Sequence, residues 1–314
     1  MFDNLLQTAI VVNLLAATVR IATPLLFGAL GEVITERAGV MNLGLEGSML
    51  MAAFVGFLVA ERTGSVLLAV LMASLAAALV NLLLGVLAIS LDADQTVTGL
   101  AINLLSSGLT LFWFRAAYTQ YNTAGTPLIE VMGDLEIPFL STLPVVGEVL
   151  FSHKILTYLA FLLVPLVSFL MYRTHIGLQI RSLGEDPRAA DMAGIPVHRL
   201  RYLAVLAGGL IVGLGGAFVS VGSVERFFPD MTAGRGWLAF VIVIAGNWKP
   251  TRILVVTLVF SLLGAIQLQA QGIGVQVPYQ VLLGLPYLVA ILAMIIGRAR
   301  SVAPECLGVP YTRE

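Results

Sequence analysis

Residues 181–201 read RSLGEDPRAADMAGIPVHRLR, the longest stretch of the chain that is dense in charges of both signs. The stretch lies between two long apolar runs and contains the signals of a short helix. Asp186 can cap an N-terminus, Pro187 suits the first helical position, and Gly194 suits the position past the end. We expect a helix from Pro187 to Ala193, about 10 Å long at about 1.5 Å per residue. A helix this short cannot span a membrane, and its charged surroundings predict a surface knob that docks a partner.

The composition around this segment is that of a membrane protein. Hydrophobic residues make up 59% of the 314 positions and charged residues 11%, against about 25% charged in soluble domains. The mean hydropathy is +0.97. The net charge of −1 offers no general attraction to nucleic acid, and the single cysteine, Cys306, excludes an internal disulfide framework or a cysteine-based zinc site. These values predict a helical protein that spans the membrane lipid several times.

Apolar runs long enough to form helices occur nine times in the sequence. They cover residues 5–30, 45–60, 65–90, 97–118, 155–172, 202–222, 233–246, 251–271 and 279–297. Two of them are short enough to be broken or re-entrant elements. We expect an all-α polytopic membrane protein with about nine or ten transmembrane helices. It would form a single transmembrane domain over residues 1–314, with its bundle between 5 and 300.

The distribution of basic residues predicts the orientation, because Lys and Arg in short loops stay on the cytoplasmic side. Five of the 17 basic residues flank or fill residues 173–201, which we expect to be a cytoplasmic loop. Residues 119–152 carry four acidic residues and no Lys or Arg, so the loop 119–153 is expected outside. Counting spans places four further segments inside, namely 31–39, 91–96, 247–252 and 298–300, and places 61–64 outside.

The N-terminus falls outside by the same count, and an extra or missing early span would reverse that placement. Its residues, MFDNLLQTA, lack a basic segment and are expected to enter the first span rather than form a signal peptide.

The motifs of an enzyme are missing from the sequence. It contains no G-x-x-x-x-G-K-[ST] phosphate loop, no His and Glu pair at metal-binding spacing, and no clear nucleophile–base arrangement. We therefore expect no catalytic residue, no metal site and no cofactor bound by this chain. In particular, the chain cannot hydrolyse ATP by itself.

The first polar interruption of the apolar runs is residues 31–47, GEVITERAGVMNLGLEG. A carboxylate inside a span costs about 2.5–3.5 kcal/mol unless it is paired or exposed to water. The presence of Glu46 in an apolar run therefore requires an explanation. Arg20 is isolated in the first span and carries the same penalty. A buried Arg20–Glu46 ion pair is one explanation, and a wet path lined by Glu46 is the other. Asn42 is expected to point back toward the membrane. The charged residues expected at the cytoplasmic surface are Glu32, Glu36 and Arg37.

Two further segments carry amides. In residues 91–105, Asn103 shares a helical face with Gly99, which suits either hydrogen bonding between helices or the lining of a path. Gln267 and Gln271 share a face near the extracellular end of their run, where amides suit a polyhydroxylated or heterocyclic ligand as well as an aqueous rim. The candidate residues of a translocation path are Asn42, Glu46, Asn103, Gln267 and Gln271.

Small residues predict two further features. Residues 231–250 have glycines at both ends of a short apolar run, which suggests a half-span or re-entrant helix. Trp237 and Trp248 in this segment are expected as anchors at the membrane interfaces. A face of small residues predicts tight helix packing in the run 202–222. This face consists of Gly209, Gly213 and Ala217.

Taken in order, three of these segments resemble the inner-membrane permease subunits of ATP-binding-cassette (ABC) importers, in the family that serves branched-chain amino acids and simple sugars. The nucleoside-type branch is the most similar. Its motif Gly-Glu…Glu-Arg-x-Gly-x-x-Asn-Leu-Gly-x-Glu-Gly corresponds to residues 31–47, and Gly-x-Asn-Pro-x-Ala-Ala…Gly-Ile corresponds to residues 184–195. Its late motif, Met-Thr-x-Gly-x-Gly…Gly-x-Trp-x-Pro, corresponds to residues 231–250. The resemblance covers residues 8–300. Asp186 stands where the family usually has Asn, and both residues cap helices.

The resemblance implies a coupling helix, because the short cytoplasmic helix of such permeases sits in a groove of the ATPase subunit. The residues that it assigns to this role are Gly184, Asp186, Pro187, Arg188, Ala189, Ala190, Ala193 and Gly194. Arg188 is expected as a peripheral contact of the ATPase, and three alanines as close contacts. These alanines are Ala189, Ala190 and Ala193.

The resemblance also implies partners and a location. The partners are an ATPase subunit that hydrolyses the ATP, a second homologous permease, and an extracytoplasmic solute-binding lipoprotein. The location is the inner membrane of a bacterium, and the expected solute is a nucleoside or a related small molecule. Residues around Arg226, Asp230 and Arg235 are a candidate landing site for the binding protein, with a solvated loop as the alternative.

Two other functions fit parts of the sequence. An ion-coupled secondary transporter of a small polar solute would use Glu46 as its ion site. A membrane enzyme would need clustered acidic or histidine residues, for which Asp92 and Asp94 offer little.

Overall fold

The computed structural model describes residues 2–118, 127–136, 145–272 and 302–312, together with positions 138, 141, 143, 284 and 288. Helices dominate these residues, as expected of an all-α membrane protein. Within the described ranges the one sheet is a two-stranded antiparallel ribbon, in which Leu135 lies opposite His153.

The elements in chain order are α1 (Phe2–Arg37), α2 (Leu45–Thr63), α3 (Val66–Gly85), the π-helical turn η1 (Val86–Ser90), α4 (Gln95–Tyr118), β1 (Asp134–Glu136), α5 (Val146–Leu150), β2 (Ser152–Lys154), α6 (Ile155–Arg173), α7 (His175–Glu185), α8 (Pro187–Met192), α9 (Val197–Ser220), α10 (Arg235–Ala245) and α11 (Pro250–Gly272).

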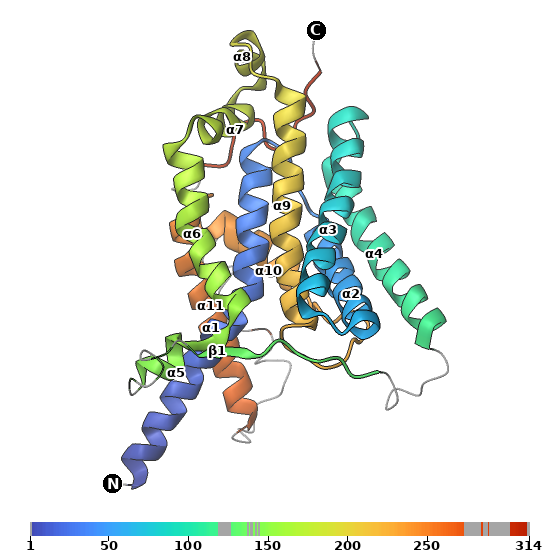
Figure 1. The fold of residues 1–314 in the computed structure, drawn as a ribbon. Helices are drawn as coiled ribbons and strands as arrows, with labels where there is room; N and C mark the ends of the chain where they lie inside the picture. Colours follow the sequence, from blue (N-terminus) through green and yellow to red (C-terminus); the bar gives the residue numbers. More distant parts are fainter. Residues whose placement is uncertain are drawn as a thin grey trace.

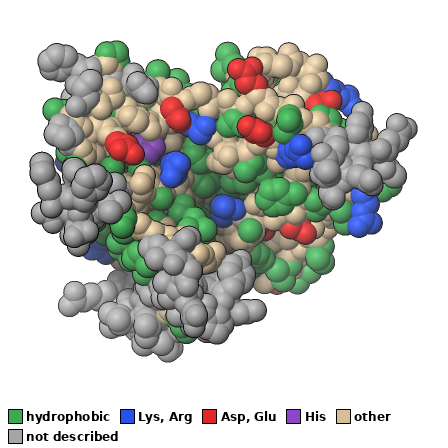
Figure 2. All heavy atoms as spheres, turned by 90° about the horizontal axis from the view of Figure 1, so that it is seen from below, with side chains coloured by type: hydrophobic (Ala, Val, Ile, Leu, Met, Phe, Trp, Pro, Cys, Tyr) green, Lys and Arg blue, Asp and Glu red, His purple; other side chains and the backbone are tan. Residues whose placement is uncertain are grey.

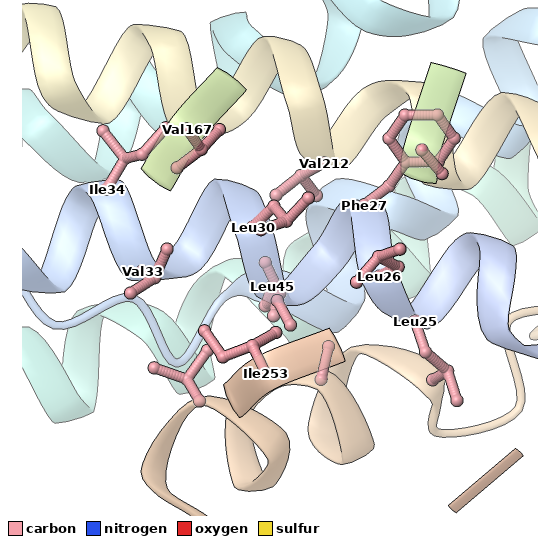
Figure 3. Close-up of a cluster of buried hydrophobic side chains, with 14 of the residues drawn as sticks. Leu25, Leu26, Phe27, Leu30, Val33, Ile34, Leu45, Val167, Val212 and Ile253 are labelled. Atoms are coloured by element: carbon pink, nitrogen blue, oxygen red, sulfur yellow. The ribbon is translucent and has the colours of Figure 1, made fainter. Parts of the chain in front are cut away.

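The centre of the bundle is formed by α1 and α9 (Figure 1). The apolar stretch of α9 is 67% buried, whereas those of α4 and α11 are 28% buried, so α4 and α11 lie at the periphery. Figure 3 shows the core around α1, where side chains from four other helices surround it. Those labelled there are Leu45 of α2, Val167 of α6, Val212 of α9 and Ile253 of α11.

The first helix continues to Arg37, beyond the predicted end of its apolar run at residue 30. Gly31 serves close packing rather than a turn. A Cβ added at Gly31 would lie 2.5 Å from the carbonyl oxygen of Gly208, so the backbones of α1 and α9 touch at this level. The bend in the chain comes only after Arg37.

Small residues on α9 allow a second close approach, to α3. A Cβ added at Gly213 would lie 2.5 Å from the Cα of Ser74, and one added at Gly209 would lie 2.8 Å from the Cα of Ala78. The Ser74 hydroxyl donates to the carbonyl of Leu210 over 2.6 Å, which ties the two helices together. The predicted face of small residues is therefore confirmed as a packing face.

Among the residues that the structure describes, six helices are long and apolar enough to cross a membrane by length and composition. They are Ile10–Arg37, Val66–Ser90, Gln95–Tyr118, Ile155–Arg173, Val197–Ser220 and Pro250–Gln271. The short apolar helix α10 has 11 residues, about 16 Å at 1.5 Å per residue, against a hydrocarbon layer of about 30 Å. The expected short helix is thus present, and its place in the membrane as a half-span or re-entrant helix stays a prediction. The predicted run 279–297 lies outside the described residues except for positions 284 and 288, so the full count of spans stays a prediction.

The two ends of the bundle carry different elements (Figure 1). One end carries α7, α8 and residues 302–312, and the other carries the β-ribbon, α5 and the N-terminus of α1. Segments predicted to be cytoplasmic meet at the first end. Arg37 Nε there donates to the carbonyl of Trp248 over 3.3 Å, and the hydroxyls of Ser90 and Tyr202 are 2.6 Å apart. We name the first end the inner end and the second the outer end, following the distribution of basic residues.

Gly213→Ala tests the packing of α9 on α3. The added methyl group would meet the backbone of α3, so we expect the free energy of unfolding to fall by about 1–3 kcal/mol. A lower thermal midpoint of the detergent-solubilised protein would report this loss. Gly108→Ala in α4 is the matched control, because no described atom lies within 4 Å of its Cβ position. Equal midpoints for the two variants would contradict the close approach.

Candidate functional site

The inner end carries a platform made of α7 and α8, between α6 and α9 (Figure 1). The chain turns sharply from α6 into α7 at Thr174. Its Oγ1 donates to the carbonyl of Leu170 over 2.6 Å and accepts from the N–H of Gly177 over 3.1 Å. Gly177 packs directly against the backbone of Leu170 and Met171, where a side chain would have no room. These residues set the angle at which α7 leaves the membrane bundle.

The short helix that the sequence predicted is α8. Asp186 Oδ1 accepts from the backbone N–H groups of Arg188 and Ala189, both over 3.0 Å, and so caps the helix. The helix ends at Met192, one residue earlier than predicted, and Gly194 follows with φ +82°. The left-handed conformation explains why glycine suits this position.

Three of the eight predicted coupling residues are buried and hold the platform together. Ala190 is only 4% exposed and packs in a cluster with Leu183, Val197 and Tyr311. This burial corrects the expectation that Ala190 is a close contact of a partner, because α8 turns it toward the bundle. The buried residues are Gly184, Pro187 and Ala190.

The outward surface of α8 is formed by four exposed residues, which we name the docking face. Met192 is 84% exposed, the largest value among the exposed hydrophobic side chains of the described residues, and the sequence analysis did not single it out. A methionine within a charged segment does not by itself indicate an exposed contact residue. Only the geometry of the helix places it on this face. The docking face consists of Arg188, Ala189, Met192 and Ala193.

Arg37 connects the platform to the membrane helices. Its Nη1 lies 3.6 Å from Glu185 Oε1 at the end of α7. Its Nε and Nη2 each donate to the carbonyl of Trp248 over 3.3 Å, in the turn between α10 and α11. Nη2 also lies 3.4 Å from the hydroxyl of Tyr172 on α6. One guanidinium at the end of α1 therefore joins α6, α7 and the α10–α11 turn.

Residues 302–312 run along the inner end and fasten the platform further. The N–H of Cys306 donates to the carbonyl of Gly184 over 2.8 Å, and the hydroxyl of Tyr311 donates to Asp191 Oδ2 over 3.0 Å. The sequence analysis missed this role. The signal was weak, because PECLGVPY has apolar residues but no helical or strand period.

The turn from α1 into α2, residues 38–44, is held by side chains of α4. Gln95 Oε1 accepts from the N–H of Met41 over 2.8 Å. Asn103 Oδ1 accepts from the N–H of Gly47, and its Nδ2 donates to the carbonyl of Leu43, both over 2.7 Å. Of the two interpretations left open for Asn103, these bonds support hydrogen bonding between segments of the bundle.

Glu32 and Glu36 are fully buried, which corrects the expectation that they lie at the cytoplasmic surface. Glu32 Oε1 accepts from the N–H of Asn42 over 3.1 Å, and Glu36 Oε2 accepts from the indole N–H of Trp248. Trp248 is 4% exposed and is therefore not an interface anchor. The carboxylates are buried because α9, α10 and the platform enclose the inner end of α1.

Glu46 caps α10 rather than pairing with Arg20. Its Oε1 accepts from the N–H of Gly234 over 2.9 Å, and its Oε2 accepts from the N–H of Gly236 over 2.6 Å. The N-terminus of a helix favours a carboxylate, so this contact explains a charge inside the bundle. Both residues are described, and no ion pair joins Arg20 to Glu46. The expected Arg20–Glu46 pair is wrong.

The five candidate path residues fall into two groups. Asn42, Glu46 and Asn103 surround the start of α2, and Asn42 Nδ2 donates to Asn81 Oδ1 over 3.3 Å. Gln267 and Gln271 lie on α11, which packs against α1, α6 and α10. The hydrogen-bonding groups of the first three are used within the protein. That any of the five lines a path stays a prediction.

The described structure is a bundle of apolar helices with a short, exposed helix at one end. Residues 14–296 match the family described as branched-chain amino acid transport system / permease component, and the chain belongs to this family. A guanosine ABC transporter permease from Bacillus subtilis is 36% identical over 95% of each chain. A nucleoside ABC transporter permease from Lactococcus lactis is 32% identical, over 93% of this chain and 94% of that protein.

The sugar branch of the family is equally near. A protein from Haloferax volcanii that is named provisionally as a glucose ABC transporter permease is 39% identical, over 96% of this chain and 98% of its own length. The same organism has a second glucose ABC transporter permease, 26% identical over 77% of this chain. No solved structure matches the chain.

The protein is therefore a multi-pass permease subunit of an ABC importer, and a separate ATPase subunit hydrolyses the ATP. Membership of this family decides against the ion-coupled carrier and the membrane enzyme as its function.

Trp248→Phe tests the link between α1 and the α10–α11 turn. The variant keeps an aromatic ring but leaves the buried Glu36 carboxylate without its indole donor. Leaving a buried polar group without its partner costs about 1–3 kcal/mol, so the thermal midpoint should fall. Trp237→Phe is the control, because Trp237 is 37% exposed. If both variants melt with the wild type, the Glu36–Trp248 bond does not support the fold.

Proposed function

We propose that α8 is the coupling helix of this permease and that its docking face seats in a groove of the ATPase subunit. The observation that carries the proposal is an exposed, capped helix that is firmly attached to the membrane bundle. The docking face is apolar at Met192 and the alanines and carries one positive charge, Arg188, at its edge. Such a surface suits an apolar groove with an acidic rim.

The contacts of Arg37 suggest how movement of α8 reaches the membrane. A displaced α8 carries α7 with it, and the Arg37–Glu185 pair passes the displacement to α1. The bonds from Arg37 to the Trp248 carbonyl pass it to the α10–α11 turn. Glu46 in turn ties the other end of α10 to α2. Closure of two ATPases around nucleotide would thus switch the permease by favouring one of two packed arrangements.

The solute that we propose is a nucleoside. Two relatives that match nearly the full chain are named for guanosine and for nucleosides. The amides of Gln267 and Gln271 are expected at the outer end of α11, where they can both donate to and accept from a base or a ribose. A simple sugar is the alternative solute, since another relative is named for glucose.

The partners that we propose complete the importer. A second, homologous permease would form the other half of the path, as the two glucose permeases of Haloferax volcanii suggest. A solute-binding lipoprotein would deliver the solute at the outer end, near Arg226, Asp230 and Arg235. We place the complex in the inner membrane of a bacterium.

Met192→Lys tests the docking face. A lysine near the C-terminus of a helix agrees with the helix dipole, so α8 should persist while an apolar contact is replaced by a charge. We expect the amount of ATPase that co-purifies with the permease to fall about tenfold, equivalent to about 1.4 kcal/mol. Val302→Lys is the control, because Val302 lies at the same end, is 69% exposed and is not on α8. Full co-purification of the ATPase with Met192→Lys would refute docking through this face.

The solute is tested with the whole importer in proteoliposomes, with its binding protein outside and ATP inside. We expect ATP-dependent accumulation of radiolabelled guanosine that excess adenosine reduces and excess glucose does not. Accumulation of glucose, with none of guanosine, would replace the nucleoside by a sugar and leave the permease function unchanged. A vesicle without the ATPase subunit is the control.

A further inference from the structure

A groove of about 360 Å³ opens on the side of the bundle, between α6 and α9 and next to α7. Figure 1 shows α6 and α9 on either side of α1, with α7 across the inner end. Ile34 of α1 and Val167 of α6, both labelled in Figure 3, are buried and belong to its floor. Leu166, Ile176 and Leu203 stand at its mouth, where each is more than half exposed. Every described residue that lines the groove is Ala, Val, Leu or Ile, so these residues offer no hydrogen-bonding side chain.

Two rows of lining residues lead from the groove toward the inner end, and each row continues into an arginine. On α9, Ala207 and Leu203 lie one turn apart, and Arg199 lies one further turn toward the inner end. On α6, the lining residue Leu170 is followed on the same face by Arg173, at the last position of the helix. Both arginines are exposed. They therefore stand at the inner rim of the groove, one on each side.

A third arginine is held near this rim by contacts with α6. Arg181 Nε donates to the carbonyl of Met171 over 3.0 Å, and its guanidinium carbon lies 4.8 Å from the centre of the Tyr172 ring. The single acidic residue of α7, Glu185, pairs with Arg37 rather than with this arginine. Figure 2 looks onto the outer end of the molecule, where acidic and basic side chains are mixed. The inner rim of the groove differs, because arginines from three helices surround it.

We propose that this groove binds one acyl chain of an anionic phospholipid and that Arg173 and Arg199 hold the lipid phosphate at its inner rim. The groove lies along two membrane helices, where lipid chains are the surrounding solvent. A guanidinium matches the oxygens of a phosphate, and basic residues at the cytoplasmic ends of spans attract anionic headgroups. Lipid tails are as apolar as the groove, so the chain gains only from close packing. Selection among lipids therefore falls to the arginines.

A helix of a partner subunit is the other apolar occupant to consider, and the groove is too small for one. One turn of α-helix is about 5.4 Å long and about 10 Å wide with its side chains, which amounts to about 400 Å³. A single turn would thus exceed the groove of about 360 Å³. A narrow, flexible acyl chain fits such a space.

A bound chain would also support the platform. Ile176 and Ile180 of α7 line the groove, so a chain seated there would pack against the helix that leads into α8. The groove is separate from the docking face of α8, and the lipid site would exist whichever solute the permease carries.

The headgroup contact is tested on the detergent-solubilised importer, stripped of lipid and titrated with phosphatidylglycerol or with phosphatidylcholine of the same chains. Native mass spectrometry counts the lipids retained. Arg199→Gln removes one cation of the rim. Arg252→Gln is the matched control, because both arginines are exposed and each is the third residue of its helix. We expect Arg199→Gln to weaken phosphatidylglycerol binding about fivefold, equivalent to about 1 kcal/mol for one arginine near anionic lipid, and the control to leave it unchanged.

Ala207→Phe tests the groove itself, because the ring would occupy the space of the chain. Ala101→Phe on α4 is the control, since Ala101 is also exposed and does not line the groove. We expect Ala207→Phe to lose the retained phosphatidylglycerol and the control to keep it. Equal retention by these two variants, or equal retention of both lipids by the wild type, would overturn the proposal. Release of a second permease subunit by Ala207→Phe, with lipid retention unchanged, would assign the groove to a subunit interface. Arg199→Gln decides the question if Ala207→Phe does not assemble.

Discussion

Irregular backbone inside an apolar layer must find its hydrogen-bond partners within the protein, and the rest of this structure depends on that constraint. The chain leaves helical geometry within the bundle between α1 and α2 and again before α10. In the first place Asn103 and Gln95 supply the partners, and in the second place Glu46 binds two N–H groups at the start of α10. The polar residues whose insertion into a membrane looks unfavourable in the sequence are the ones that supply hydrogen-bond partners at these breaks. Without them a short helix such as α10 would leave unpaired backbone groups inside the bundle.

The same constraint connects the two ends of the protein. Each side chain that satisfies a break also joins two helices, so the breaks become points where displacement can pass from one helix to another. Arg37 joins α7 to the α10–α11 turn, and Glu46 joins the other end of α10 to α2. α10 is thereby held at both ends by residues of the 31–47 segment. A short helix held in this way can tilt as a unit, which suits a permease that alternates between two packed arrangements.

Local signals allowed correct predictions, and contacts between distant residues did not. The cap at Asp186, the turn at Gly194 and the length of α10 depend on neighbouring residues, so the sequence was enough to predict them. The burial of Glu36 depends on Trp248, 212 residues later in the chain, and no local pattern reports it. The prediction for Ala190 was wrong for a related reason, because capping signals give the extent of a helix but not which of its faces meets the bundle. The short helix itself was visible in the glycines, whereas its carboxylate cap was not.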